Sequence, residues 1–114
     1  MKLNDVLKGK SEEDILSSID DLRPNDLLTK SITRSFLPGI KKALEMGADV
    51  HAQNDFALRW ASRYGNYNVV KLLLKYGADV HAHDDTALVW ASANSYYNVV
   101  KLLLKNGANK RRWN

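Results

Sequence analysis

The chain has 114 residues, which suits one compact domain, and it carries 17 lysines and arginines against 13 acids, a formal net charge of +4. It has no cysteine, which excludes disulfides, thiolate metal sites and a cysteine nucleophile. No apolar run approaches the roughly 18 residues of a membrane span, and the charged N-terminal sequence lacks a signal-peptide core. We therefore expect a soluble, cytoplasmic protein that does not associate with membranes.

Residues 1–23 are predicted to form an N-terminal capping segment. Ser11 precedes the sequence EEDILSSI, and a serine followed by acids is typical of a helix start because both complement the free backbone N–H groups. Ile15 and Ile19 then lie on one helical face. We expect a helix over residues 11–20 that covers the first of the repeats that follow.

The middle of the chain repeats itself every 30 residues. Gly47, Gly77 and Gly107 follow this spacing, and the octapeptide NVVKLLLK occurs twice. A fixed period of about 20–50 residues indicates stacked helical or strand units, because one unit cannot bury its apolar face alone. A first copy with a more polar sequence suits an end cap. The predicted repeats cover residues 24–109, with copies at about 24–53, 54–83 and 84–109.

Each copy is predicted to hold two short helices. Asp55 and Asp85 stand where the first helix begins and suit an N-cap, since a carboxylate accepts bonds from free N–H groups. Gly65 ends that helix in a left-handed turn, and the second helix runs from about residue 68 to 76. Ser95 replaces this glycine in the next copy, at a cost of about 1 kcal/mol if the turn is kept. The last repeat is therefore expected to be less stable.

Apolar residues that recur at the 30-residue spacing are predicted to form the core. They are Leu58 and Leu88, Ala61 and Ala91, Val70 and Val100, and Leu74 and Leu104. Lys71 and Lys75, on the other face of the second helix, are expected to face water.

The sequences GADVHA, ALRWAS and GNYNVVKLLLKYGAD resemble the ankyrin-repeat family over about residues 24–109. The resemblance implies an all-α solenoid of stacked helix pairs that recognises a partner protein without catalysis. The family's period is about 33 residues, and here the shortening falls in the finger, so we expect short fingers without a hairpin. Units of this length are similar to ankyrin proteins of large DNA viruses and bacteriophages. That similarity implies a viral inhibitor of a host or defence factor in the host cytoplasm.

Candidate binding residues are the positions that differ between copies while the frame stays constant. By the resemblance, the turn and the end of the first helix line a concave groove. A solvated face with scattered aromatic residues is the alternative. Arginine and tyrosine are common at interface hot spots, and the basic half of the chain favours an acidic partner surface. The candidates are Phe56, Arg59, Arg63, Tyr64, Asn94 and Tyr96, with Thr33 and Arg34 in the first copy.

Two further groups of residues follow the repeat and have two interpretations each. Trp60 and Trp90 either pack between neighbouring first helices, which we favour, or form an aromatic strip on the groove. His51, His81 and His83 suggest a metal site, but the first two occupy a repeated loop position and no third ligand has a fixed spacing. We favour a structural role in the loop and expect no metal and no cofactor.

The basic sequence at residues 110–114 has three interpretations. It is a solvated tail, or Trp113 folds back over the apolar side of the last repeat. In the third, Lys110, Arg111 and Arg112 contact phosphate groups while Trp113 stacks on a base.

The sequence contains no converging catalytic set and no phosphate-binding glycine motif, so we expect a protein that is not an enzyme. The favoured hypothesis is a protein-binding module, monomeric or weakly self-associating. One alternative is a nucleic-acid-associated basic protein, because residues 51–114 hold nine lysines and arginines against four acids. The other is a structural subunit that self-assembles through its open apolar end.

Overall fold

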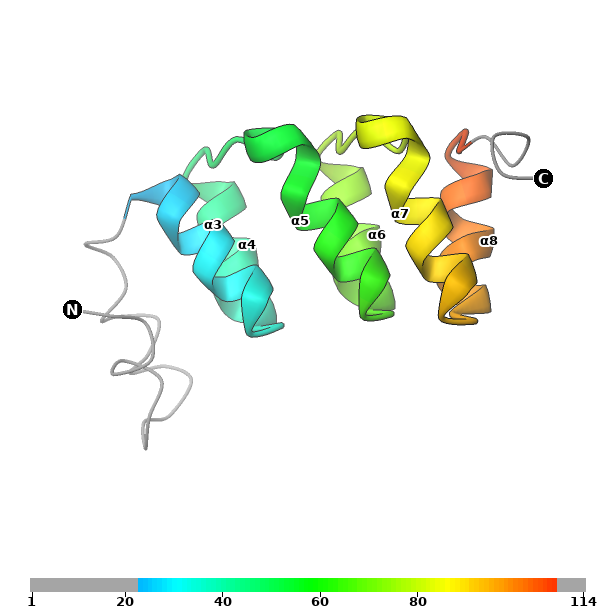
Figure 1. Cartoon of the computed structure of the whole chain (residues 1–114). Coiled ribbons are helices and arrows are strands. Elements are labelled where there is room, and N and C mark those ends of the chain that lie inside the picture. Colours follow the sequence, from blue (N-terminus) through cyan, green and yellow to red (C-terminus); the bar gives the residue numbers. More distant parts are fainter. Residues whose placement is uncertain (1–22, 109–114) are drawn as a thin grey trace. The chain divides into compact units, whose positions relative to one another are not determined.

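The computed structural model describes residues 23–108, and within this range every regular element is a helix and none is a strand. The helices alternate as first and second members of pairs joined by tight turns (Figure 1). Their bounds are α3 Pro24–Thr33, α4 Leu37–Glu45, α5 Ala52–Arg63, α6 Tyr67–Lys75, α7 Ala82–Ala93 and α8 Tyr97–Lys105. In the described part of the chain, no helix has the length and apolar character to span a membrane. The helix predicted over 11–20 and the tail at 110–114 lie outside the described residues.

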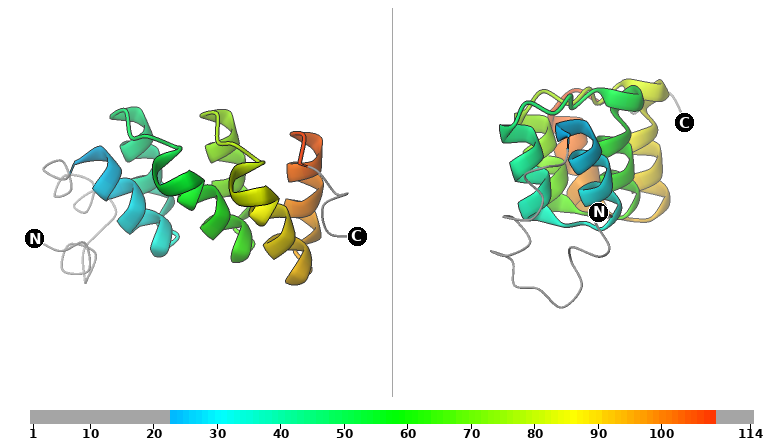
Figure 2. Two further views of the ribbon diagram at one scale, coloured as in Figure 1. Left: turned by 45° about the horizontal axis from the view of Figure 1, so that its top comes forward. Right: turned by 90° about the vertical axis from the view of Figure 1, so that its left-hand side faces the viewer.

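The chain divides into two compact units between Asp49 and Val50. In the first unit, α3 packs against α4. In the second unit, α5 packs against both α6 and α7, α7 packs against α8, and α6 lies beside α8 (Figure 2). The first helices of the second unit therefore form one layer and the second helices form another, as the repeat predicts.

The core of the second unit agrees with most of the recurring positions. Leu58, Leu88 and Val70 are fully buried, as are both alanines of the predicted core. The prediction for Leu104 is wrong, because 36% of this residue is exposed. The fully buried leucines of α6 and α8 are instead Leu73 and Leu103. A step of one residue turns the side chain by about 100° around a helix, which moves it from the packed face to its edge.

The turn before each first helix has an unusual backbone. Gln53, Asn54 and Asp55 in the first turn of α5 have φ values of 55°, 61° and 56°. The equivalent residues of α7, His83, Asp84 and Asp85, have φ values of 57°, 57° and 59°. Three left-handed residues in a row reverse the chain within a short connection. They take the place of the longer finger, so the regular part of the first helix begins only at Phe56 and Thr86.

A side-chain oxygen at the start of a first helix binds the backbone that follows the second helix. Asn25 Oδ1 accepts the N–H of Asp49, and Asp55 Oδ2 accepts the N–H of Asp79, both at 2.7 Å and both across 24 residues. Asp55 is buried, so its carboxylate serves this bond rather than the predicted cap of its own helix. The bond closes the α3–α4 pair and the α5–α6 pair at the end where the first helix begins and the second helix ends.

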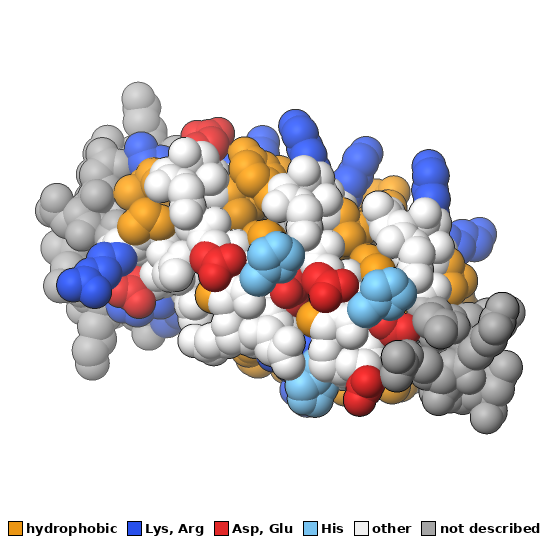
Figure 3. Space-filling view, turned by 90° about the horizontal axis from the view of Figure 1, so that it is seen from above, with side chains coloured by type: hydrophobic (Ala, Val, Ile, Leu, Met, Phe, Trp, Pro, Cys, Tyr) orange, Lys and Arg blue, Asp and Glu red, His pale blue; other side chains and the backbone are white. Residues whose placement is uncertain are grey.

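Histidine completes this arrangement in the second unit. Nδ1 of His51 lies 3.0 Å from the carboxylate of Asp55, and Nδ1 of His81 lies 2.8 Å from that of Asp85. Histidine and acidic side chains accordingly gather on the surface that carries the turns (Figure 3). Both imidazoles are exposed while both carboxylates are buried, so the pairs lie at the rim of the core and have a structural role.

The turn between paired helices is left-handed in every copy. Its φ value is 70° at Gly65 and 59° at Ser95, which confirms that the serine keeps the conformation of the glycine. The ring of Tyr96 packs against Gly65, where an added Cβ would come within 2.6 Å of the ring. Serine adopts this backbone at position 95, so the contact with Tyr96 is the additional reason for glycine at position 65.

The first prediction concerns the bond across 24 residues. Asp55→Ala is expected to lower the free energy of unfolding by about 1–3 kcal/mol, because the Asp79 N–H and His51 lose their acceptor. Asp55→Asn is the matched control and is expected to cost less, because Asn25 makes the same bond with an amide oxygen. Urea denaturation followed by circular dichroism measures both losses, and equal losses would contradict the role of the bond.

The second prediction concerns the left-handed turn. Ser95→Gly is expected to raise the free energy of unfolding by about 0.5–1 kcal/mol, because glycine adopts φ of 59° without strain. The reciprocal Gly65→Ser is expected to cost more than that, since its Cβ also meets the ring of Tyr96. Thermal denaturation of the two variants tests the pair. A lower melting temperature for Ser95→Gly than for the parent chain would be the contrary result.

Candidate functional site

A row of aromatic side chains runs along the outward face of α5. Phe56, Trp60 and Tyr64 are four residues apart, so they lie one above another on the helix. The ring centroids are 5.4 Å apart for the first pair and 4.9 Å for the second, with the rings tilted against each other. Tyr64 is 48% exposed and the other two rings are half-buried. The row therefore offers ring surface to a partner while supporting itself.

Arg63 connects this row to the neighbouring first helix. Its guanidinium carbon lies 5.0 Å from the ring centroid of Trp90 on α7 and 5.6 Å from that of Tyr64. These are cation–π distances, and such contacts hold a guanidinium in place while leaving its N–H groups free to bind. Arg63 is exposed and pairs with no carboxylate among residues 23–108. An oriented positive charge thus lies between two aromatic rings.

Arg59 has a different role on the same helix. Its Nε donates to the carbonyl of Asn54 at 3.0 Å, and its Nη2 donates to the carbonyl of Gln53 at 2.9 Å. It therefore holds the left-handed turn that precedes the regular part of α5. In the next copy Val89 replaces this arginine, and the hydroxyl of Thr86 donates to the carbonyl of His83 instead. Arg59 also lies near the ring of Phe56, at 6.0 Å.

These side chains form one surface, which we call the aromatic–arginine patch. It lies entirely in the second unit, on the layer of first helices. Its members are Phe56, Arg59, Trp60, Arg63, Tyr64 and Trp90.

The structure places the remaining candidates outside this patch. Asn94 donates from Nδ2 to the carbonyl of Trp90 at 2.8 Å and so caps the end of α7. Tyr96 is the N-cap residue that precedes α8, and its ring packs against the Gly65 turn. In the first unit, Thr33 donates to the carbonyl of Lys30 at 3.0 Å and Arg34 is exposed at the end of α3.

The two tryptophans have features of both interpretations, because Trp90 of α7 contacts Arg63 of the neighbouring first helix α5 while Trp60 belongs to the aromatic row. Trp60 lies between Phe56 and Tyr64, and both tryptophans are half-buried. The signal was present in the sequence, because aromatic residues at positions 56, 60 and 64 follow the helical spacing of four. Repetition at the 30-residue period favours a frame position for Trp60, and this interpretation gives no indication of the aromatic row.

Metal binding has no support in the described part of the chain. Among residues 23–108, no three side chains of the His, Cys, Asp or Glu type are grouped so that they could hold a metal ion. The histidines contact acids or a threonine hydroxyl instead, as in the bond of 2.8 Å between His83 Nδ1 and Thr86 Oγ1. The aromatic–arginine patch itself offers aromatic rings and two guanidinium groups.

The fold and the patch together define a helical-repeat protein that presents a surface. The family model described as ankyrin repeats (3 copies) matches residues 30–113. That match covers well over half of the chain, so the chain belongs to the ankyrin-repeat family. Ankyrin repeats generally mediate protein–protein interaction and are generally non-catalytic modules. In the comparison with curated proteins, no sequence matches this chain.

Proposed function

We propose that this protein is a non-catalytic module that binds the acidic surface of a partner protein through the aromatic–arginine patch. The observation that carries the proposal is the position of Arg63. Its guanidinium is exposed, oriented by the rings of Trp90 and Tyr64, and unpaired with any carboxylate among residues 23–108. A carboxylate of the partner would complete its charge pairing.

The composition of the patch supports strong binding from a small area. Tryptophan, tyrosine and arginine are the residue types that most often dominate binding energy at interfaces. A guanidinium fork accepts a carboxylate with two parallel hydrogen bonds, which adds direction to charge attraction. Because Arg63 is already held by two rings, less side-chain freedom is lost when the partner binds.

The other candidate residues belong to the proposal as outer contacts. Asn94 ends the same helix that carries Trp90, and Tyr96 follows directly after that turn. Thr33 and Arg34 occupy the equivalent end of α3 in the first copy. The exposure of Thr33, Arg34 and Asn94 supports a contact role, while Tyr96 is half-buried against the Gly65 turn. Asn94 also stabilises the end of its own helix.

The finer proposal is inhibition of a host or defence factor by a viral protein in the host cytoplasm. Its support is the similarity of the short ALRWAS units to ankyrin proteins of large DNA viruses and bacteriophages. A rigid stack that occupies one surface of a target can block that surface without chemistry. The proposed binding unit is a monomer or a weak homo-oligomer.

The third prediction tests the patch. In pull-downs from nuclease-treated native lysate, the tagged chain is expected to retain one dominant protein, identified by mass spectrometry. Arg63→Glu with Tyr64→Ala is expected to weaken that interaction by about 30-fold or more, because it removes a ring and places two like charges together. Titration of the purified partner by calorimetry measures the change in Kd.

The matched control applies the same two changes to the other layer of helices. Lys71→Glu with Tyr97→Ala alters a lysine and a tyrosine on α6 and α8 and is expected to keep the affinity for the protein partner. Circular dichroism confirms that both variants are folded. A partner that survives the patch variant, or is lost equally in both, would exclude the patch as its binding site.

A further inference from the structure

The second helices of the second unit carry a surface that the proposed function does not use. Both α6 and α8 have the sequence YNVVKLLLK, and neither contains an acid. The four lysines of these helices are exposed, while Val69, Val70, Val99 and the middle leucines are buried. The lysines are Lys71 and Lys75 on α6 and Lys101 and Lys105 on α8.

The lysines form two parallel rows of equal spacing. Residues four apart on a helix are separated by roughly 6 Å along its axis, and packed helices lie roughly 8–10 Å apart. Since α6 lies beside α8, the rows are neighbours on one face. The acids of residues 50–108 lie in or next to the turns and outside these two helices: Asp55, Asp79, Asp84 and Asp85. The face is therefore positive without an internal counter-charge.

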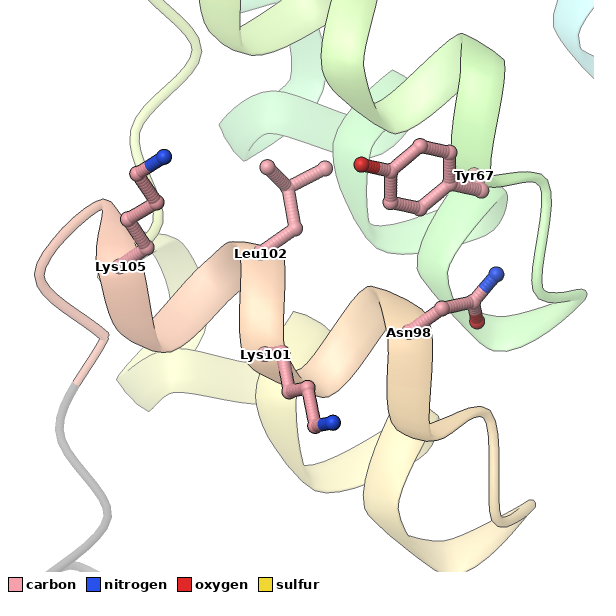
Figure 4. Close-up of a pocket in the computed structure, with 5 residues that line it drawn as sticks. All are labelled: Tyr67, Asn98, Lys101, Leu102 and Lys105. Atoms are coloured by element: carbon pink, nitrogen blue, oxygen red, sulfur yellow. The ribbon is translucent and has the colours of Figure 1, made fainter.

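A groove of about 480 Å³ opens between these two helices. Figure 4 shows its lining, in which Tyr67 directs its hydroxyl toward the side chain of Leu102. Lys101 and Lys105 extend to either side of this apolar floor, and the amide of Asn98 lies at its edge. An apolar groove with amines at its margins suits a planar ring attached to an anionic chain.

We propose that this face binds the backbone of a single-stranded nucleic acid. The lysines contact successive phosphates, and a base enters the groove against Tyr67 and Leu102. Tyr97, which stands 30 residues after Tyr67, is 68% exposed and offers a second ring for stacking. Lysines that follow the backbone, combined with rings that accept any base, are the features that bind single strands without sequence preference.

The same features disfavour a membrane surface. Helices that bind in a membrane interface present a free apolar face, often with tryptophan or phenylalanine. In α6 and α8 the apolar face is turned inward, since Val69, Leu73, Val99 and Leu103 are buried. Neither helix contains tryptophan or phenylalanine. The lysines are thus the outermost groups, and a linear polyanion satisfies them better than a bilayer.

The fourth prediction uses fluorescein-labelled oligo(dT) and oligo(U) of 20 nucleotides with the full chain. We expect micromolar Kd values by fluorescence anisotropy at about 50 mM salt. Contact of four lysines with phosphates gives a slope of about −2.8 for log K against log salt. Lys101→Gln with Lys105→Gln is expected to reduce that slope to about −1.4, and replacement of all four lysines is expected to abolish binding.

Stacking is tested separately from charge. Tyr67→Leu keeps an apolar floor without the aromatic ring and is expected to weaken binding about tenfold at unchanged salt slope. Arg63→Glu with Tyr64→Ala serves as the matched control on the opposite layer and is expected to keep the oligonucleotide Kd within about twofold. The proposed function and this proposal are therefore tested independently. The patch variant is expected to keep the oligonucleotide bound, and the variant on α6 and α8 is expected to keep the protein partner bound.

Four results would overturn the proposal. The parent chain shows no oligonucleotide binding, or the four-lysine variant binds as the parent does. Deletion of 110–114 abolishes binding while the four-lysine variant retains it, which assigns binding to the tail. Poly-glutamate or vesicles with about one third phosphatidylserine compete at charge concentrations equal to that of the oligonucleotide, which shows a general anion surface. Circular dichroism of each variant confirms its helical content before binding is measured.

Discussion

In the α3–α4 pair and in the α5–α6 pair, the backbone N–H that follows the second helix donates to a side-chain oxygen at the start of the first helix, and this hydrogen bond closes the pair. In the second unit its acceptor is the buried carboxylate of Asp55, and its donor is the N–H of Asp79. Removing a carboxylate from water is costly, and this cost is offset by the short bond to the N–H and by the adjacent imidazole of His51. The turn is thereby fixed, and with it the rotation of α5 about its axis. The aromatic row faces outward because that rotation is set.

Much of the fold is predictable from the 30-residue period, because helical pairs, glycine turns and buried leucines all repeat with it. The partner of Asp55 is not predictable, since a bond across 24 residues exists only once both helices have packed. The left-handed run at residues 53–55 is equally hidden, because each residue alone is compatible with a helix. The choice between Leu73 and Leu74 depends on where the neighbouring helices lie, and both leucines suit an apolar face.

Comparison of the repeat copies predicts only part of the aromatic–arginine patch. Variable positions led to Phe56, Arg63 and Tyr64, which the structure brings together. Repetition predicts frame positions, yet Trp60 and Trp90 follow the repeat and are only half-buried. A side chain can recur because it supports its neighbours on the surface, as the ring of Trp90 supports Arg63. Arg59 shows the reverse, because it varies between copies and holds a turn.

The first helices of the second unit differ in sequence between copies, whereas the second helices are identical, and this contrast corresponds to the kind of ligand that each layer can bind. The first helices α5 and α7 differ at their exposed positions, so their layer presents a unique arrangement of rings and charge. A unique arrangement can match only one shape, which is the condition for recognising a particular protein surface. The second helices α6 and α8 are identical, so their layer presents the same charges at a constant interval. A constant interval matches a polymer that repeats its own charge, whatever its sequence. On both layers the pattern of the surface indicates the pattern of its ligand: identical helices suit a repeating polyanion, and differing helices suit one particular protein surface.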